Sequence, residues 1–177
     1  GASVVSDLII VLYGSQNAAF VAGEALAVFQ QEAGTEPEDI VVVTRAETGR
    51  VSVNQSIDLA TGRPLGGGRW GTLIGMLFLD RRKPGEQDRG LTARFLEAGV
   101  EQSFLLAVGQ ALDKGGAAVG MRVRLLGANR VLDRVKALKG APKILQTRLS
   151  AETEDALYDM QNQIPQGVLN QSADGPF

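Results

Sequence analysis

The residues with the clearest chemical potential are a group of cations in the C-terminal half of the chain. Between Met121 and Leu149 the sequence holds eight basic residues against one acid, Asp133, whereas residues 1–60 hold eight acids against two bases. Clustered guanidinium and ammonium groups attract anions, so this half is a candidate anion-binding surface. The residues that we assign to it are Arg122, Arg124, Arg130, Arg134, Lys136, Lys139 and Lys143.

A basic surface of this kind has several candidate partners. It suits an acidic protein, a small anionic ligand or an anionic membrane surface. The acidic first third of the chain offers another partner, a second copy that pairs head to tail, and a merely solvated basic face is the plainest alternative. No aromatic residues are interleaved with the cations, and single-stranded nucleic acids need such stacking platforms. The sequence therefore argues against a nucleic-acid partner.

The residue types that perform most enzyme chemistry are missing. The 177 residues include no cysteine and no histidine, so thiolate nucleophiles, imidazole bases and the commonest transition-metal ligands are all excluded. The carboxylates are scattered without a paired motif. We predict no catalytic residue, no metal site, no cofactor and no enzymatic activity. A chain without cysteine fits a reducing compartment, so we expect a cytoplasmic protein, with membrane association as the alternative.

A glycine-rich stretch over residues 66–79 is the most distinctive local pattern. Gly67, Gly71 and Gly75 recur every fourth residue and would form one smooth side of a helix. Three interior glycines cost a helix about 3 kcal/mol relative to alanine, which close packing against another element would offset. That element is either the protein's own sheet or another subunit, and glycine repeats favour the second. The predicted interface residues are Gly67, Trp70, Gly71, Ile74, Gly75 and Phe78.

The same stretch also has a weaker reading as a phosphate loop. Residues 66–72 supply the glycines and a terminal threonine, but they lack the lysine that reaches the outer phosphates and they do not follow the central strand. A small-anion-binding regulatory module, with the polar residues 80–90 as a lid, is the alternative that this reading leaves open.

The pattern of apolar residues predicts alternating strands and helices. The unbroken apolar run from Leu8 to Leu12 is typical of a central strand covered on both faces. The expected strands are 7–13, 40–44, 51–57, 117–126 and 143–149, and the expected helices are 18–34, 66–79, 91–98, 100–113, 129–139 and one that follows Ser150.

The first six of these elements match the βαββαβ plan of ferredoxin-like α+β folds. The predicted fold is therefore α+β, with a ferredoxin-like core, an inserted glycine-rich helix and a C-terminal helix-strand-helix extension. Residues 1–160 would form one domain that includes a mobile polar loop over 80–90, and residues 161–177 would form a flexible tail.

Several segments resemble a known protein family. They are the first strand, the predicted hairpin of residues 40–53, the block Trp-Gly-Thr-Leu-Ile-Gly-Met-Leu-Phe at 70–78 and the strand Ile-Leu-Gln-Thr-Arg-Leu-Ser at 144–150. Together they resemble a bacterial family of unknown function often described as predicted membrane proteins, some of whose members are called general stress proteins. The likeness covers residues 7–160 and transfers no activity. Typical members follow the glycine-rich helix with a second apolar helix, but this chain has the charged residues 80–89 there, which argues against membrane insertion.

These observations favour a non-catalytic protein that forms homo-oligomers, as a scaffold or a stress-related protein, with the glycine-rich helix at the contact. The alternatives are the small-anion-binding regulatory module and a peripheral binder of anionic membranes. The sequence identifies no small-molecule ligand.

Overall fold

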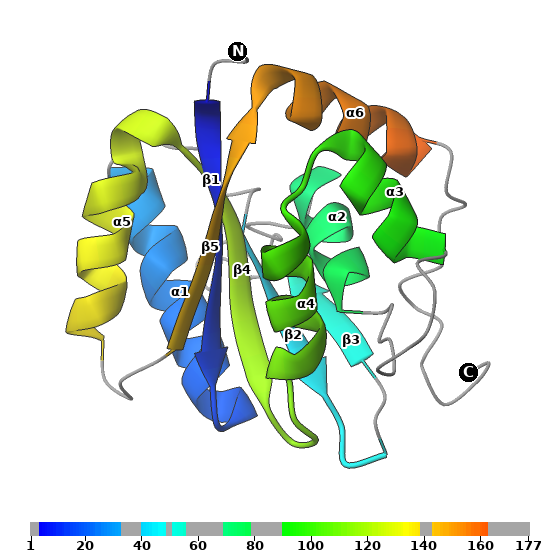
Figure 1. The fold of residues 1–177 in the computed structure, drawn as a ribbon. Coiled ribbons are helices and arrows are strands. Elements are labelled where there is room, and N and C mark those ends of the chain that lie inside the picture. The colour runs from blue at the N-terminus through cyan, green and yellow to red at the C-terminus, as the bar shows by residue number, and fades with distance from the viewer. Residues whose placement is uncertain are drawn as a thin grey trace.

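The computed structural model describes residues 4–32, 40–48, 51–55, 69–78, 90–138 and 143–162. These residues form one sheet and six helices (Figure 1). The strands are β1 (Val4–Tyr13), β2 (Ile40–Arg45), β3 (Val51–Gln55), β4 (Ala117–Arg124) and β5 (Lys143–Ser150). The helices are α1 (Gln16–Glu32), α2 (Arg69–Leu77), α3 (Gly90–Ala98), α4 (Gln102–Ala111), α5 (Leu125–Ala137) and α6 (Ala151–Asn162). The predicted α+β class is confirmed.

The sheet has the order β3-β2-β4-β1-β5, and every neighbouring pair is antiparallel. Strands β1 and β2 are thus parallel to each other, are joined through α1 and have β4 between them. Strands β4 and β5 are likewise parallel, are joined through α5 and have β1 between them. The strand expected at 51–57 corresponds to β3, which lies at one edge of the sheet and, among the described strands, pairs only with β2. The strand expected in the C-terminal extension is β5, which belongs to the same sheet.

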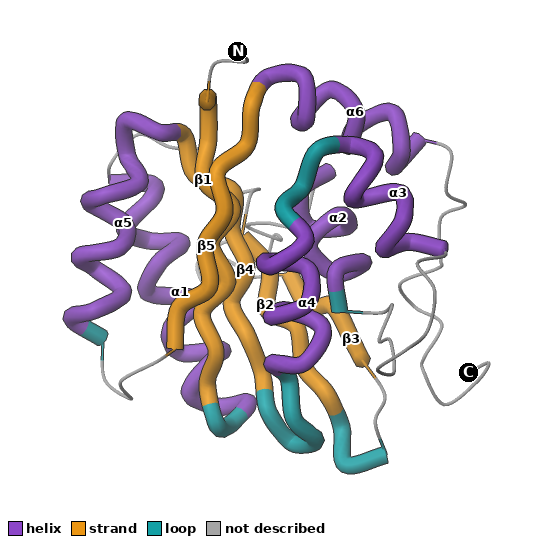
Figure 2. Tube along the Cα trace, in the orientation of Figure 1, coloured by secondary structure: helices purple, strands orange, loops and turns teal. Residues whose placement is uncertain are grey.

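The apolar run in β1 is buried on both faces, as its composition predicts. Leu8 and Ile10 point into one hydrophobic core, whereas Ile9 and Val11 point into the other. This alternation follows from the period of two along a strand. The sheet is therefore the middle layer of three (Figure 2).

The two outer layers have different helices. Helices α1 and α5 cover one face of the sheet, here named the α1/α5 face, and supply the core that contains Ile9 and Val11. Helices α2, α3, α4 and α6 cover the opposite face, here named the α2/α6 face. The two sets stand on opposite sides of the strands in Figure 1.

The predicted bounds agree with the observed ones to within a few residues. The largest shift is at α5, which begins at Leu125, directly after β4, instead of near residue 129. The last helix does follow Ser150, which caps it, because the Thr153 amide donates to Ser150 Oγ at 3.1 Å. The predicted loop and tail lie outside the described residues, apart from Gly90 in α3 and the last two residues of α6.

Candidate interaction surface

Helix α1 carries apolar side chains on two sides. Ala19, Ala22 and Leu26, spaced three and four residues apart, are buried against the sheet. On the outer side, three large apolar side chains remain in solvent with one charged residue, Glu24, among them. These side chains are Phe20, Val21 and Val28, with exposed fractions of 38%, 59% and 51%.

The outer residues form a continuous stripe along α1. Val21, Glu24 and Val28 are spaced three and four residues apart, so they share one side of the helix, and Phe20 adjoins Val21. Single exposed apolar residues are ordinary on a protein surface, but a contiguous group marks a contact site more often. We name this stripe the α1 outer face.

Helix α5 lies beside α1 and supplies exposed cations. Its apolar residues Ala128, Val131 and Val135 are buried in the same core as those of α1. Arg130 Cζ lies 5.9 Å from the centroid of the Phe29 ring on α1, and Arg134 Cζ lies 6.0 Å from it. Cation–π contacts of this kind contribute about 0.5–1 kcal/mol each at exposed sites. They place the Phe29 ring beside α5 at the level of these two arginines.

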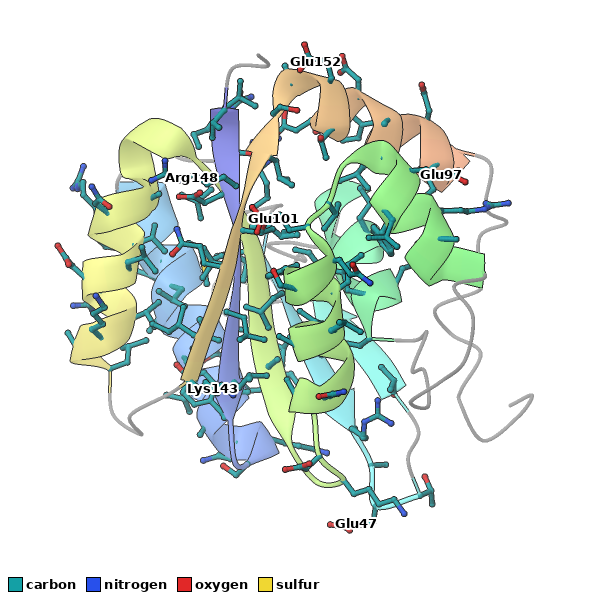
Figure 3. The ribbon with its side chains drawn as sticks, in the orientation of Figure 1. Glu47, Glu97, Glu101, Lys143, Arg148 and Glu152 are labelled. Carbon is teal, nitrogen blue, oxygen red and sulfur yellow. The ribbon has the colours of Figure 1, made fainter. Side chains whose placement is uncertain are left out.

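Four of the predicted anion-binding residues are exposed on α5 or at its start. Arg130, Arg134 and Lys136 are exposed along α5, and Arg124 is exposed at the junction of β4 and α5. Lys143 lies at the opposite end of β5 from Arg148 (Figure 3). Lys139 lies outside the described residues.

Arg122 differs from the other predicted anion-binding residues because it is buried on the α2/α6 face. It pairs with Leu8 in the sheet register, so the two side chains share that face. Its Nε lies 3.5 Å from Glu154 Oε2, and its Nη2 donates to the Tyr158 hydroxyl at 3.2 Å. Ser6 Oγ also donates to Glu154 Oε2, at 2.6 Å. Arg122 therefore binds an anion, but that anion is a carboxylate of its own chain.

This buried polar cluster, made of Ser6, Arg122, Glu154 and Tyr158, joins α6 to the sheet. Neither Glu154 nor Tyr158 is among the site residues predicted from the sequence. The spacing of four residues between them was the available signal, because it places both on one side of α6. Both side chains contact Arg122, which is buried on the central strand β4. Within the cluster the charges of Arg122 and Glu154 compensate each other, and each of these residues has a further partner.

A second buried carboxylate lies on the α1/α5 face. Asp7 is only 2% exposed, and its Oδ1 lies 3.7 Å from Nε of the exposed Arg148 on β5. Among the described residues this oxygen has no hydrogen bond. The separation is that of an ion pair without a direct hydrogen bond.

The described half of the glycine-rich helix is buried within the chain. Ile74 and Phe78 are 0% and 1% exposed, and Gly75 is buried as well. Ile74 packs onto Gly120 in the middle of β4, where a Cβ would overlap Ile74 Cγ2 and lie 3.2 Å from Ile10 Cδ1. The glycine that permits this close approach is thus on the strand. Gly67 lies outside the described residues, as do the side-chain surroundings of Trp70 and Gly71.

Tyr13 is a buried tyrosine on the α1/α5 face, at the end of β1. Its hydroxyl has no hydrogen-bond partner among the described residues. Burial raises the pKa of this phenol above its ordinary value of 10.0, because the charged phenolate is poorly solvated there.

Neither a candidate membrane helix nor a candidate metal-binding cluster is found among the described residues. None of their helices has the length and apolar character that a membrane crossing requires. Nor do these residues bring three or more histidine, cysteine, aspartate or glutamate side chains together in a group that could hold a metal ion.

Comparison with known proteins supports the resemblance seen in the sequence. No curated protein and no solved structure matches the chain. A family model described as "Protein of unknown function (DUF1269)" matches residues 64–161, a segment that contains α2, α3, α4, β4, α5 and β5 and reaches into α6. This match spans more than half of the chain, and the chain therefore belongs to this family of unknown function.

Proposed function

We propose that the protein is a non-catalytic module that associates with copies of itself through the α1 outer face. The observation that carries this proposal is the exposure of Phe20, Val21 and Val28 on one helix. Fully burying a side chain of this size stabilises a complex by about 1.5–3 kcal/mol relative to leaving it in water. A two-fold contact would bury each of them twice, which is the usual arrangement in homodimers.

The glycine-rich helix is a weaker candidate for the contact than the sequence suggested. Ile74 and Phe78 are already in the protein's own core, so a second copy could not reach them without opening the fold. The α1 outer face is exposed on the folded chain and requires no such opening.

The ion pairs of the buried residues Arg122, Glu154 and Asp7 support a non-catalytic role. Arg122 and Glu154 contact each other and further partners within the chain, and Asp7 is paired with Arg148. A small-anion ligand would have to displace Glu154 from Arg122, so the alternative of an anion-binding regulatory module has less support.

The proposal includes a ferredoxin-like kernel that carries the α1 outer face. Its members would be β1, α1, β2, β4, α5 and β5, since their strand order and two crossed connections follow the split βαβ plan. Strand β3 and helices α2, α3 and α4 would be an insertion between β2 and β4, and α6 would be a C-terminal addition. The kernel helices α1 and α5 would then be the surface open to a partner.

The test is the molar mass of the protein in solution. We expect the wild type to be an oligomer by light scattering after size exclusion, and the double variant Val21→Asn/Val28→Asn to be a monomer. The change removes apolar area from the contact, and the buried amide groups would lose hydration, whichever helix of the other copy lies opposite.

Leu106→Asn is the matched control, because Leu106 is 49% exposed on α4, across the sheet from α1. It should leave the mass unchanged. Thermal unfolding of all variants would show that the folds are intact. A wild type that stays monomeric over the whole concentration range, or a double variant that keeps the wild-type mass, would refute the proposal.

A further inference from the structure

The two helices of the α1/α5 face carry opposite charge on their exposed sides. On α1 the described exposed side chains include one charged group, Glu24. On α5 they include Arg130, Arg134 and Lys136 against Asp133. The apolar stripe and the acid are therefore on one helix, and the excess of cations is on its neighbour.

The heights of these groups along the two helices can be compared. Helices α1 and α5 run in opposite directions, because β1 and β4, which lead into them, are antiparallel. The Phe29 ring lies about level with the midpoint between Arg130 and Arg134, since both guanidinium groups contact it. Glu24 precedes Phe29 by five residues, or about 7.5 Å along α1. Because the helices are antiparallel, the same distance in the same direction is a step toward the C-terminus of α5. From the midpoint between Arg130 and Arg134 it ends close to Lys136.

A second copy can face this surface in two symmetric ways. A two-fold axis across the helices places α1 on the partner's α1 and α5 on the partner's α5. A two-fold axis parallel to the helices places each α1 on the partner's α5 and preserves the heights. The first arrangement opposes like charges, whereas the second brings Glu24 to the level of the partner's Lys136.

We infer that the protein dimerises in the second arrangement, with α1 of each copy packed on α5 of the other and Glu24 paired with the partner's Lys136. This inference rests on the proposed self-association and adds its geometry. Val21 and Val28 flank Glu24 and pack on the aliphatic stems of the partner's cations, which can cover apolar surface while their charged ends stay solvated. The ion pairs select the arrangement, and the apolar stripe supplies most of the affinity.

A charge exchange tests this pairing. Glu24→Lys and Lys136→Glu should each raise the dimer dissociation constant by about tenfold, because each places like charges opposite one another twice per dimer. The double variant Glu24→Lys/Lys136→Glu restores opposite charges and should return the constant to within about threefold of the wild type. Sedimentation velocity over a dilution series would measure the dissociation constants of the wild type and the three variants. The buffer should contain 0.15 M salt, at which the Debye length is about 8 Å.

The control exchange is Glu101→Lys/Lys114→Glu, which makes the same charge changes at exposed positions away from α1 and α5. It should leave the constant unchanged. If the wild type is a dimer but Glu24→Lys/Lys136→Glu dimerises more weakly than either single variant, this arrangement is overturned and self-association still stands. A monomeric wild type would overturn self-association itself.

Discussion

The two faces of the sheet differ in how completely their helices are covered. On the α2/α6 face four helices share one core, and even the glycine-rich helix is packed inward at Ile74 and Phe78. On the α1/α5 face two helices cover the same strands, and α1 keeps large apolar side chains in solvent.

This difference separates the part of the molecule that stabilises the fold from the part that can bind a partner. Apart from Leu106, the large apolar side chains described on the α2/α6 face have internal partners, as does its buried ion pair, so little free energy remains there for association. The α1/α5 face has unburied apolar area and exposed cations together. Substitutions on the first face should therefore change the free energy of unfolding, whereas exposed ones on the second should change the association constant.

The largest expected loss of stability comes from breaking the buried polar cluster. Glu154→Ala should lower the free energy of unfolding by about 3 kcal/mol, because Arg122, whose side chain is only 7% exposed, would lose its counter-charge. Ser6 would lose its acceptor in the same step. Denaturant titration followed by circular dichroism would measure the change.

Glu152→Ala is the matched control on the same helix, since Glu152 is exposed in the first turn of α6. It should cost no more than a few tenths of a kcal/mol from the helix dipole. Equal effects of the two substitutions would show that the cluster adds nothing to stability.

A smaller loss is expected at the contact between α2 and the sheet. Gly120→Ala places a methyl group against Ile74 and Ile10 and should cost about 1–3 kcal/mol by overpacking. Gly109→Ala on α4, where a Cβ meets nothing within 4 Å, should instead stabilise the helix by up to about 1 kcal/mol. The free energies of unfolding of the two variants, measured by chemical unfolding, separate the effect of the close contact at Gly120 from that of a glycine-to-alanine change in general. A Gly120→Ala protein as stable as wild type would mean that Ile74 moves aside without cost.

The local elements were predictable from the sequence because local chemistry determines them. The continuous apolar run of β1 predicts burial on both faces, and Ser150 predicts the start of α6 through its hydroxyl. The order of the strands in the sheet was harder to predict, because neither β4 nor β5 is near β1 in the chain. Local patterns do not specify which strands pair over such separations, so the edge position of β3 could not be read from residues 51–55.

The candidate surface was predictable only in part for the same reason. The charge excess identified α5, but it grouped Arg122 with residues on the other side of the sheet. Strand alternation places Arg122 with Ala118 and Leu8, and a cation in a covered central strand requires a buried partner. The glycine pattern predicted a packing helix, yet the opposing glycine, Gly120, is on a strand that no helical period reveals.

The smallest expected change in stability comes from the two tyrosines of the chain, Tyr13 and Tyr158, which lie on opposite faces of the sheet. The Tyr158 hydroxyl accepts a hydrogen bond from Arg122 at 3.2 Å, so Tyr158→Phe should cost about 1 kcal/mol near neutral pH. The Tyr13 hydroxyl has no hydrogen-bond partner among the described residues. Tyr13→Phe should therefore be neutral or stabilising by up to about 1 kcal/mol, because a buried unpartnered hydroxyl is replaced by a hydrogen atom.

The pH dependence of Tyr13→Phe gives a second readout with a definite sign. Because burial raises the pKa of Tyr13 in the folded protein, the unfolded chain loses this proton first as the pH rises past the ordinary value of 10.0. The folded state then binds more protons than the unfolded state, and the free energy of unfolding of the wild type falls. Tyr13→Phe removes this loss, so its advantage over wild type should grow above pH 10. Denaturant titrations at pH 7 and near pH 11 would measure it, and a constant difference between the two proteins would mean that the phenol is as well solvated in the fold as in the unfolded chain.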